Sequence, residues 1–169
     1  MYNDAPAKSR KLKAPFDPSE IEWRIQQAGE SNGKKWGMVL AYITNRAIME
    51  RLDEVFGVGG WQNEYQPMPD GGVICGIKAK VGDKWITKYD GADKTAIEAT
   101  KGGLSNAMKR AGVQWGIGRY LYRLDTTFVT LKEGRPENDN QIHAYVDKKH
   151  YHFDRPKLPS FAIPEAQDD

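Results

Sequence analysis

Apolar residues recur at helical spacing between residues 95 and 115, and this is the clearest pattern in the chain. Five of them form one stripe, with gaps of seven, four, three and four residues: Ile97, Leu104, Met108, Ala111 and Trp115. Thr95 and Glu98 make a capping box, so we expect a long helix to begin there. Asn106 and Lys109 lie opposite the stripe, with Arg110 at its edge. The pattern predicts a helix with one buried face and one polar, basic face.

Three short apolar segments before this helix predict an antiparallel meander. The predicted strands are residues 61–66, 73–81 and 84–89. The connections between them are rich in glycine, proline and aspartate, as hairpin turns are. In the second strand Ile77, Ala79 and Val81 share one face, while Lys78 and Lys80 share the other. One side of this sheet is therefore expected to be buried.

The region before the meander predicts two short helices and one further strand. Ser19 and Glu22 make a capping box, which predicts a helix that ends before Gly29. Residues 36–43 are almost continuously apolar and predict a buried strand. Thr44 or Asn45 can cap the next helix, and Gly57 can end it. After the long helix, two further strands are predicted, over residues 126–131 and 142–153.

These elements predict an α+β fold. We expect an antiparallel sheet, made of the three-strand meander plus an additional strand, packed on a long C-terminal helix with shorter helices before it. Residues 1–17 are expected to be a flexible basic arm, residues 18–153 one domain, and residues 154–169 an acidic tail that contains prolines.

Composition excludes several classes of protein. Cys75 is the single cysteine, so no disulfide framework or cysteine-rich zinc site is expected. No apolar run approaches the roughly 20 residues of a membrane-spanning helix, and the basic N-terminus has no apolar core of a secretory signal. We therefore expect a cytoplasmic protein with no membrane partner.

The positive charge is grouped although the net charge is only +2. Residues 1–14 hold four basic residues and one acidic residue, and residues 93–124 hold six basic and two acidic residues. The last ten residues hold three acidic residues and no basic one. Grouped charge is typical of proteins that bind a polyanion, although a solvated helix face and a disordered tail have the same composition.

Motifs for nucleotide, metal or covalent chemistry are weak. The segments Gly57-Val-Gly-Gly60 and Gly116-Ile-Gly118 lack the context of a phosphate-binding loop, so no cofactor is expected. His143, His150 and His152 have no cysteine or carboxylate partners at ligand spacing, and surface histidines explain them better. Cys75 has no base near it in the sequence and is expected in the core. Asp90 and Asp93 resemble a nuclease pair only loosely.

A surface that binds single-stranded nucleic acid fits the pattern better. Lys109 and Arg110 can pair with phosphates, and Lys101 lies two turns earlier. Trp36 and Tyr42 have flat faces on which bases could stack, which is the usual design for single strands. Core packing is the alternative for these aromatic side chains.

Three motifs resemble the Rad52/22 family of single-strand annealing proteins, and most closely its short bacteriophage and prophage members. The resemblance covers roughly residues 23–125. The motifs are Leu52-Asp-Glu-Val-Phe-Gly57 with Gly60-Trp61, Cys75-Gly-Ile-Lys-Ala-Lys80, and Lys101-Gly-Gly-Leu-Ser-Asn-Ala-Met-Lys-Arg-Ala111 with Trp115-Gly116. The last of these is long and specific. It resembles the signature helix of the family, with its Lys-Arg pair and its aromatic-glycine ending.

The resemblance implies a DNA-binding role for particular residues. In the family the Lys-Arg pair lines a groove around an oligomeric ring and binds the backbone of single-stranded DNA. Carried over, Lys109 and Arg110 are the first candidates, and Arg24 and Tyr42 match a second arginine and a groove tyrosine. The remaining candidates are Lys101, Lys35, Asn106 and Lys94, of which Lys94 is the obvious substitute for a second, outer DNA site.

The resemblance implies ATP-independent binding and annealing of single-stranded DNA in homologous recombination and double-strand break repair. It also implies that residues 18–153 are a single-strand annealing domain that binds DNA and assembles into a homo-oligomeric ring. A single-strand-binding protein is implied as a further partner. No enzymatic activity and no metal are expected. Two alternatives stay open: a protein that coats single strands without annealing them, and a metal-dependent nuclease that uses Asp90 and Asp93.

Overall fold

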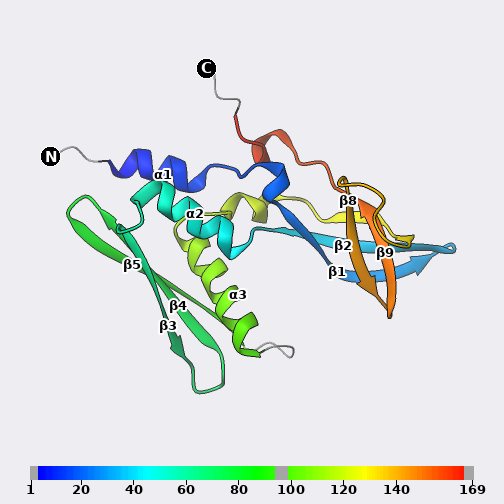
Figure 1. Cartoon of the computed structure of the whole chain (residues 1–169), viewed down its shortest axis with the longest axis horizontal. Helices are drawn as coiled ribbons and strands as arrows, with labels where there is room; N and C mark the ends of the chain where they lie inside the picture. The colour runs from blue at the N-terminus through cyan, green and yellow to red at the C-terminus, as the bar shows by residue number, and fades with distance from the viewer. Residues whose placement is uncertain (1–3, 94–98, 166–169) are drawn as a thin grey trace. The chain divides into compact units, whose positions relative to one another are not determined.

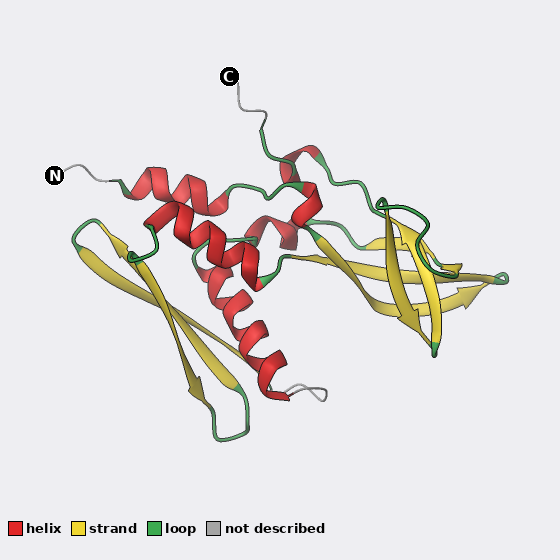
Figure 2. Cartoon of the chain, in the orientation of Figure 1, coloured by secondary structure: helices red, strands yellow, loops and turns green. Residues whose placement is uncertain are grey.

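The computed structural model describes residues 4–93 and 99–165 of the chain (Figure 1). It is an α+β structure in which the strands form antiparallel sheets, as the sequence predicts (Figure 2). The internal contacts divide the chain into two compact units. Unit 1 comprises Met1–Pro15 and Ile43–Arg119, and unit 2 comprises Phe16–Tyr42 and Tyr120–Asp169.

Unit 1 combines three helices with one sheet. Its elements are α1 (Ala5–Lys13), α2 (Asn45–Phe56), β3 (Trp61–Pro67), β4 (Val73–Val81), β5 (Lys84–Ala92) and α3 (Ala99–Gln114). The sheet has the order β3-β4-β5, which confirms the predicted meander. Helix α3 contacts β4 and β5, and it runs along this sheet in Figure 1.

The core of unit 1 lies between α3 and one face of β4. The Cys75, Ile77 and Ala79 side chains on that face are fully buried, and so are Ala107 and Ala111 on the helix. These alternate residues of β4 face the same side because side chains in a strand have a period of two. The sheet therefore buries one face, as predicted.

The predicted helical stripe is confirmed at three of its positions, whereas Leu104 is only half-buried. Met108, Ala111 and Trp115 are buried, and the Trp115 indole Nε1 donates a hydrogen bond to the Ile77 carbonyl at 2.9 Å. Ile97 and the capping box of residues 95–98 lie outside the described residues. The C-terminal position expected for this helix is not confirmed, because strands β6 to β9 follow α3 in the chain.

Local signals at both ends of α2 are confirmed. The Thr44 hydroxyl accepts a hydrogen bond from the Ala47 N–H at 3.2 Å, as an N-cap side chain does. Gly57 ends the helix with a φ of 76°, a backbone conformation that suits glycine. Ile48 and Leu52 are fully buried between these ends.

The first residues do not form the flexible arm that the composition predicts. Residues 5–13 are helix α1, and Leu12 on this helix is buried. The Arg51 side chain of α2 is also buried, and its Nη1 donates to the Lys11 and Ala14 carbonyls at 2.8 Å each. The cation thus binds the carbonyl groups left unpaired at the end of α1. Composition could not indicate this order, because it arises from contacts with a helix about 40 residues later.

Unit 2 contains two small antiparallel sheets. Its elements are the 3₁₀ turn η1 (Pro18–Glu20), β1 (Glu22–Ser31), β2 (Lys34–Tyr42), η2 (Arg119–Arg123, shared at its start with unit 1), β6 (Thr127–Thr130), β7 (Lys132–Glu133), β8 (Gln141–Val146), β9 (Lys149–Asp154) and η3 (Ser160–Ala162). The sheet orders are β1-β2-β6 and β7-β9-β8. The additional strand predicted at residues 36–43 is therefore β2, but it belongs to a sheet separate from the meander.

The prediction of a helix that starts at Ser19 is wrong. Residues 22–31 form β1, which pairs with β2 through a tight turn at Asn32 and Gly33. Both turn residues have positive φ, 52° and 71°, as a two-residue hairpin turn of type I′ requires. An Asn-Gly pair is a strong hairpin signal, and here it outweighs the apparent capping box.

The segment from residue 142 to 153 is a hairpin of two strands instead of the single edge strand predicted. Strands β8 and β9 meet at Asp147 and Lys148, which have φ of 50° and 63°. The turn contains no glycine, so the usual sequence signal is missing. Beyond it, Ala162 in η3 is fully buried, so this part of the expected tail packs on the unit.

The core of unit 2 is formed by residues distant in sequence. Ile21, Val39, Leu131 and Phe153 are all buried. Strand β1 contacts β8, and β6 contacts β9, so the two sheets meet at this core. The opposite face of β2 is more open, with Leu40 and the neighbouring Phe128 of β6 exposed.

Candidate nucleic-acid interface

Helix α3 places three of the predicted residues on one face. Asn106, Lys109 and Arg110 are three or four positions apart, so they are neighbours on the surface of the helix. Asn106 and Lys109 are half-buried, and the Arg110 side chain is 56% exposed. The opposite face carries Ala107 and Ala111, which are buried against the sheet. A rigid helix thus presents adjacent cationic groups away from the core.

Arg110 forms an ion pair with a carboxylate of β5. Its Nε lies 3.0 Å from Asp90 Oδ1, and the same carboxylate accepts from Gln114 Nε2 at 3.0 Å and from the Gly91 N–H at 2.8 Å. Burial alone would raise the pKa of Asp90, but the hydrogen bonds from Gln114 and Gly91, together with Arg110, hold that pKa below its usual value. Asp90 is therefore ionised at neutral pH. No local pattern in the sequence connects Asp90 with Arg110, so this partner was not predicted.

Two other cations bind the C-terminal end of α3: Arg119 from the basic segment and Lys88 from β5. The Arg119 guanidinium donates to the Val113 carbonyl at 2.8 Å and to the Gln114 carbonyl at 3.0 Å. Lys88 Nζ donates to the same Gln114 carbonyl at 3.1 Å and lies over the Trp115 ring. Cations are favourable at this end of a helix because its carbonyl groups carry partial negative charge. Part of the grouped charge therefore stabilises the fold.

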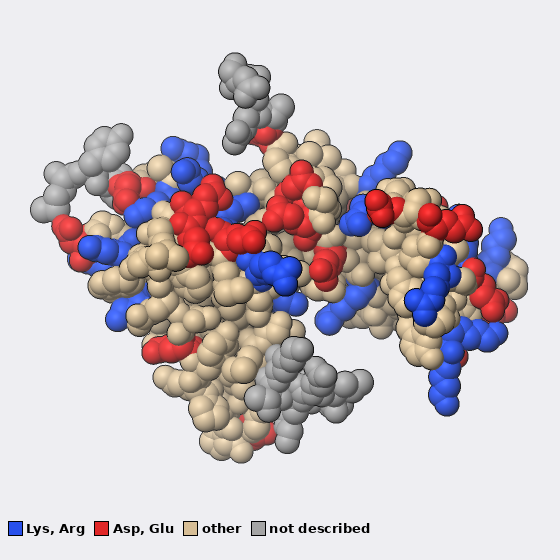
Figure 3. Space-filling model, in the orientation of Figure 1, with Lys and Arg blue, Asp and Glu red and all other residues tan. Residues whose placement is uncertain are grey.

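The structure gives no side-chain position for two of the predicted residues. Lys101 belongs to α3, but its side chain is outside the description, and Lys94 lies outside the described residues. On the face of unit 1 that Figure 3 shows, acidic atoms gather over α2, which carries Glu50, Asp53 and Glu54. A basic surface does not extend across that helix.

Unit 2 brings Arg24 and Tyr42 together on paired strands. The Arg24 guanidinium lies 5.6 Å from the centre of the Tyr42 ring, within the range of a cation–π contact. Burial and a hydrogen bond with Glu22 raise the pKa of Tyr42 to about 12, so its phenol stays protonated. Arg24 and Tyr42 are thus neighbours in unit 2, and their contact with DNA stays a prediction.

Lys35 has a partner in the same unit. Its Nζ lies 2.6 Å from Asp147 Oδ2, and this hydrogen bond raises the pKa of Lys35. The pair joins β2 to the β8–β9 turn. Trp36, the other aromatic candidate, packs edge-on against Phe128 with 5.7 Å between ring centres.

The alternative chemistries find little support in the described residues. Residues 4–93 and 99–165 contain no group of three or more histidine, cysteine, aspartate or glutamate side chains placed to hold a metal ion. Asp90 is already bound by three donors. Cys75 is fully buried, and burial raises the pKa of its thiol to about 11, as expected for a core cysteine.

The histidines differ from the prediction in one respect. His143 Nε2 and His150 Nδ1 lie 2.8 Å apart on the β8–β9 hairpin, near the surface. His152 is buried, with Nδ1 3.3 Å from the Gly134 carbonyl, so it is not a surface histidine. Alternation along β9 does not predict this burial, because His152 faces the same side as His150 and the opposite side from the core residue Phe153.

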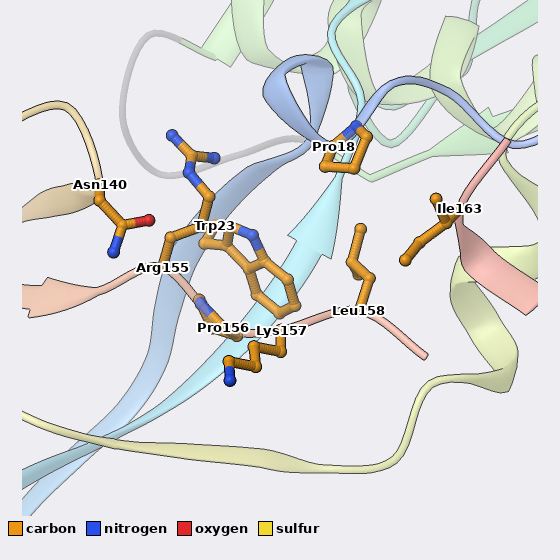
Figure 4. Close-up of a pocket in the computed structure, with 8 residues that line it drawn as sticks. All are labelled: Pro18, Trp23, Asn140, Arg155, Pro156, Lys157, Leu158 and Ile163. Atoms are coloured by element: carbon orange, nitrogen blue, oxygen red, sulfur yellow. The ribbon is translucent and has the colours of Figure 1, made fainter. Parts of the chain in front are cut away.

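A pocket of about 330 Å³ lies within unit 2 (Figure 4). The Trp23 indole is at its centre, between Asn140 and Arg155 on one side and Leu158 and Ile163 on the other (Figure 4). Its lining is mainly apolar, and none of the predicted DNA-binding residues belongs to it. The pocket therefore does not suit a phosphate backbone.

The fold and the site describe an α+β protein whose candidate interface is a cationic helix face. The family model for the Rad52/22 family double-strand break repair protein matches residues 6–73 and 68–140. The chain belongs to this family. It is 29% identical over 160 residues to the single-stranded DNA-binding protein DdrA of Deinococcus radiodurans. The aligned residues cover 94% of this chain and 68% of the relative. DdrA of Deinococcus deserti is 28% identical, with 94% and 71% covered. No helix among the described residues is long and apolar enough to cross a membrane.

Proposed function

We propose that this protein binds single-stranded DNA and anneals complementary strands without ATP, in recombination and double-strand break repair. The observation that carries the proposal is the similarity over 94% of the chain to two relatives named as single-stranded DNA-binding proteins, within a family named for double-strand break repair. The protein acts in the cytoplasm, where the DNA of a bacterial cell is found.

Phosphate groups of the strand bind the cationic face of α3. Lys109 and Arg110 neutralise phosphates and release the counterions condensed on the DNA, which favours binding at low salt. Asn106 lies one turn before them and can donate a hydrogen bond to a phosphate or a sugar. Arg24 and Tyr42 of unit 2 provide a second contact, and Lys101 and Lys94 extend the basic segment toward the start of α3.

Annealing itself needs no catalytic group. The protein holds the backbone, the base edges stay accessible, and base pairing supplies the free energy for joining the second strand. This explains why an activity can reside in a chain whose described residues contain no metal cluster and whose single cysteine is buried.

The protein assembles as a homo-oligomeric ring. A head-to-tail interface that closes on itself produces a ring. Support comes from the face of the meander that points away from α3, where the Trp85 and Tyr89 side chains are 45% and 49% exposed. Mass photometry of the purified protein is expected to show one discrete oligomer, and a monomer at micromolar concentration would contradict the ring. A single-strand-binding protein is a further partner, which a pull-down with such a protein on DNA would test.

The decisive experiment is the annealing of two complementary, differently labelled oligonucleotides without ATP, with and without magnesium. We expect the protein to accelerate duplex formation and to leave both strands intact; a pair of non-complementary oligonucleotides is the control. Binding without acceleration would favour a protein that only coats single strands, which is what the printed names of the relatives describe. Magnesium-dependent loss of DNA would indicate a nuclease instead.

A further inference from the structure

Asp90 is a carboxylate that the structure places against Arg110, one of the two residues of the proposed phosphate-binding pair. It lies on β5, and its side chain is only 20% exposed. Gln114 and the Gly91 N–H hold it independently of Arg110, at 3.0 and 2.8 Å. The negative charge is therefore fixed at this position whether or not Arg110 is in contact with it.

Arg110 is held less firmly than its partner. Its side chain is 56% exposed, and among the described residues only the Nε has a hydrogen-bond partner, at 3.0 Å from Asp90. Exposed ion pairs of this kind contribute little to the stability of the fold. The guanidinium can therefore rotate toward a phosphate, while Gln114 and the Gly91 N–H keep the half-buried carboxylate where it is.

The consequence is a competition for one cation. In the free protein Asp90 neutralises Arg110, so part of the positive field of the helix face is cancelled. When Arg110 binds a phosphate, Asp90 loses its counter-charge and lies close to a second anion. Like charges at such short range oppose each other, so the carboxylate weakens the binding of the strand.

We propose that Asp90 is a built-in competitor of the DNA backbone for Arg110, and that it limits how tightly the protein holds a single strand. This inference rests on the proposed function. It adds a reason for the limit: an annealing protein must release the strand into the duplex, and a weaker hold on each phosphate makes that release faster.

The test is the Asp90→Asn variant, measured by fluorescence anisotropy with a labelled oligonucleotide over a range of salt. The amide keeps the size of the side chain, and its oxygen can still accept hydrogen bonds from Arg110 and the Gly91 N–H. The negative charge, however, is removed. We expect binding about three to ten times tighter than that of the wild type at low salt. The slope of the logarithm of the binding constant against the logarithm of the salt concentration should become steeper by up to about one unit.

The matched control is Asp83→Asn, in the turn between β4 and β5. It removes the same charge from the same sheet, seven residues or about 23 Å away along β5. Its affinity is expected to equal that of the wild type within a factor of two. An equal gain for both variants would mean that only net charge matters, and it would overturn the inference.

A double variant shows whether Asp90 acts through Arg110. With Arg110→Ala in place, Asp90→Asn is expected to change the affinity by less than a factor of two. Thermal melting of each variant verifies that it is folded. Unchanged or weaker binding by a folded Asp90→Asn protein would overturn the inference, while wild-type binding in the same assay would leave the proposed function intact. Absence of binding by the wild type would overturn both.

Discussion

Unit 1 covers its sheet with a helix, whereas unit 2 brings two small sheets into contact, and the candidate cations differ accordingly. In unit 1 they project from α3, whose buried residues Ala107, Met108 and Ala111 hold it on the sheet. In unit 2 they belong to strands β1 and β2, where Arg24 contacts the Tyr42 ring and Lys35 forms an ion pair with Asp147. A helix presents neighbouring side chains every three or four residues, so it can align charges along a backbone more regularly than a twisted hairpin can.

The cationic side chains of this protein therefore have more than one use. Arg51 is buried, and Arg119 and Lys88 bind the end of α3, so these cations stabilise unit 1. Arg110 instead pairs with Asp90, and we assign the main contribution to DNA binding to Lys109 and Arg110. The cations of unit 2 are expected to adjust this binding.

The largest effect is expected for Arg51→Met, which removes a structural cation of unit 1. Its two hydrogen bonds of 2.8 Å end at carbonyl groups that would lose their charged donor. We expect a loss of about 2–3 kcal/mol in the free energy of unfolding, measured with urea. Arg46→Met, on the exposed side of the same helix, is the control and is expected to change stability by less than about 0.5 kcal/mol. Equal stability of the two variants would contradict a structural role for Arg51.

The next largest effect is expected for the double change Lys109→Ala with Arg110→Ala. Loss of two phosphate contacts should weaken binding of single-stranded DNA by about ten- to a hundredfold at low salt, on many sequences alike. The slope of the logarithm of the binding constant against the logarithm of the salt concentration should also become shallower by about two units. The control removes two exposed cations of unit 2 by Lys132→Ala with Lys149→Ala. Unchanged binding by a folded Lys109/Arg110 variant would refute the assignment of the site to α3.

A smaller effect is expected for Arg24→Ala, which tests the contribution of unit 2. Its exposed cation–π contact with Tyr42 positions the guanidinium, and its loss should weaken DNA binding about two- to fivefold. Tyr42→Phe keeps the ring and serves as the companion variant; it should bind within a factor of two of the wild type. If Arg24→Ala weakened binding as much as the α3 double variant, the proposed ranking of the two units would be wrong.

The smallest effect concerns pH and the β8–β9 hairpin. Desolvation, with the charges of Arg135 and His143, lowers the pKa of His150 below 6.5 in the folded protein. The unfolded chain therefore binds a proton first as the pH falls, so this contribution to stability is present above pH 6.5 and is lost below it. We expect His150→Gln to flatten the fall of the melting temperature between pH 7.5 and 5.5 by about one or two degrees. An identical pH profile for the variant would remove His150 from this account.

The parts of the fold that follow from local signals were predictable. The cap at Thr44, the stop at Gly57 and the alternation in β4 each depend on a few consecutive residues, and all three are confirmed. The first hairpin was mispredicted because two local signals compete there. A capping box suggested a helix, while Asn32 and Gly33 favoured a turn, and the long pairing of β1 with β2 decides between them.

The pairing of distant segments was not predictable from a single sequence. Residues 36–39 of β2 pair with residues 127–130 of β6, and no local pattern connects the two. The same holds for the site. The sequence identified Arg110, but its partner Asp90 lies on another element, 20 positions earlier. Burial of Arg51 also depends on where α1 ends.

The meander, the amphipathic helix with its Lys-Arg pair and the resemblance to a family could all be recognised in the amino-acid sequence. They depend on the periodicity and identity of neighbouring residues, which the chain carries wherever it folds. The folded structure was needed to show which cations cap helices, which one faces a fixed carboxylate and which strands share a sheet. Those outcomes depend on distances of about 3 Å between groups far apart in the chain, and such distances exist only after the core has formed.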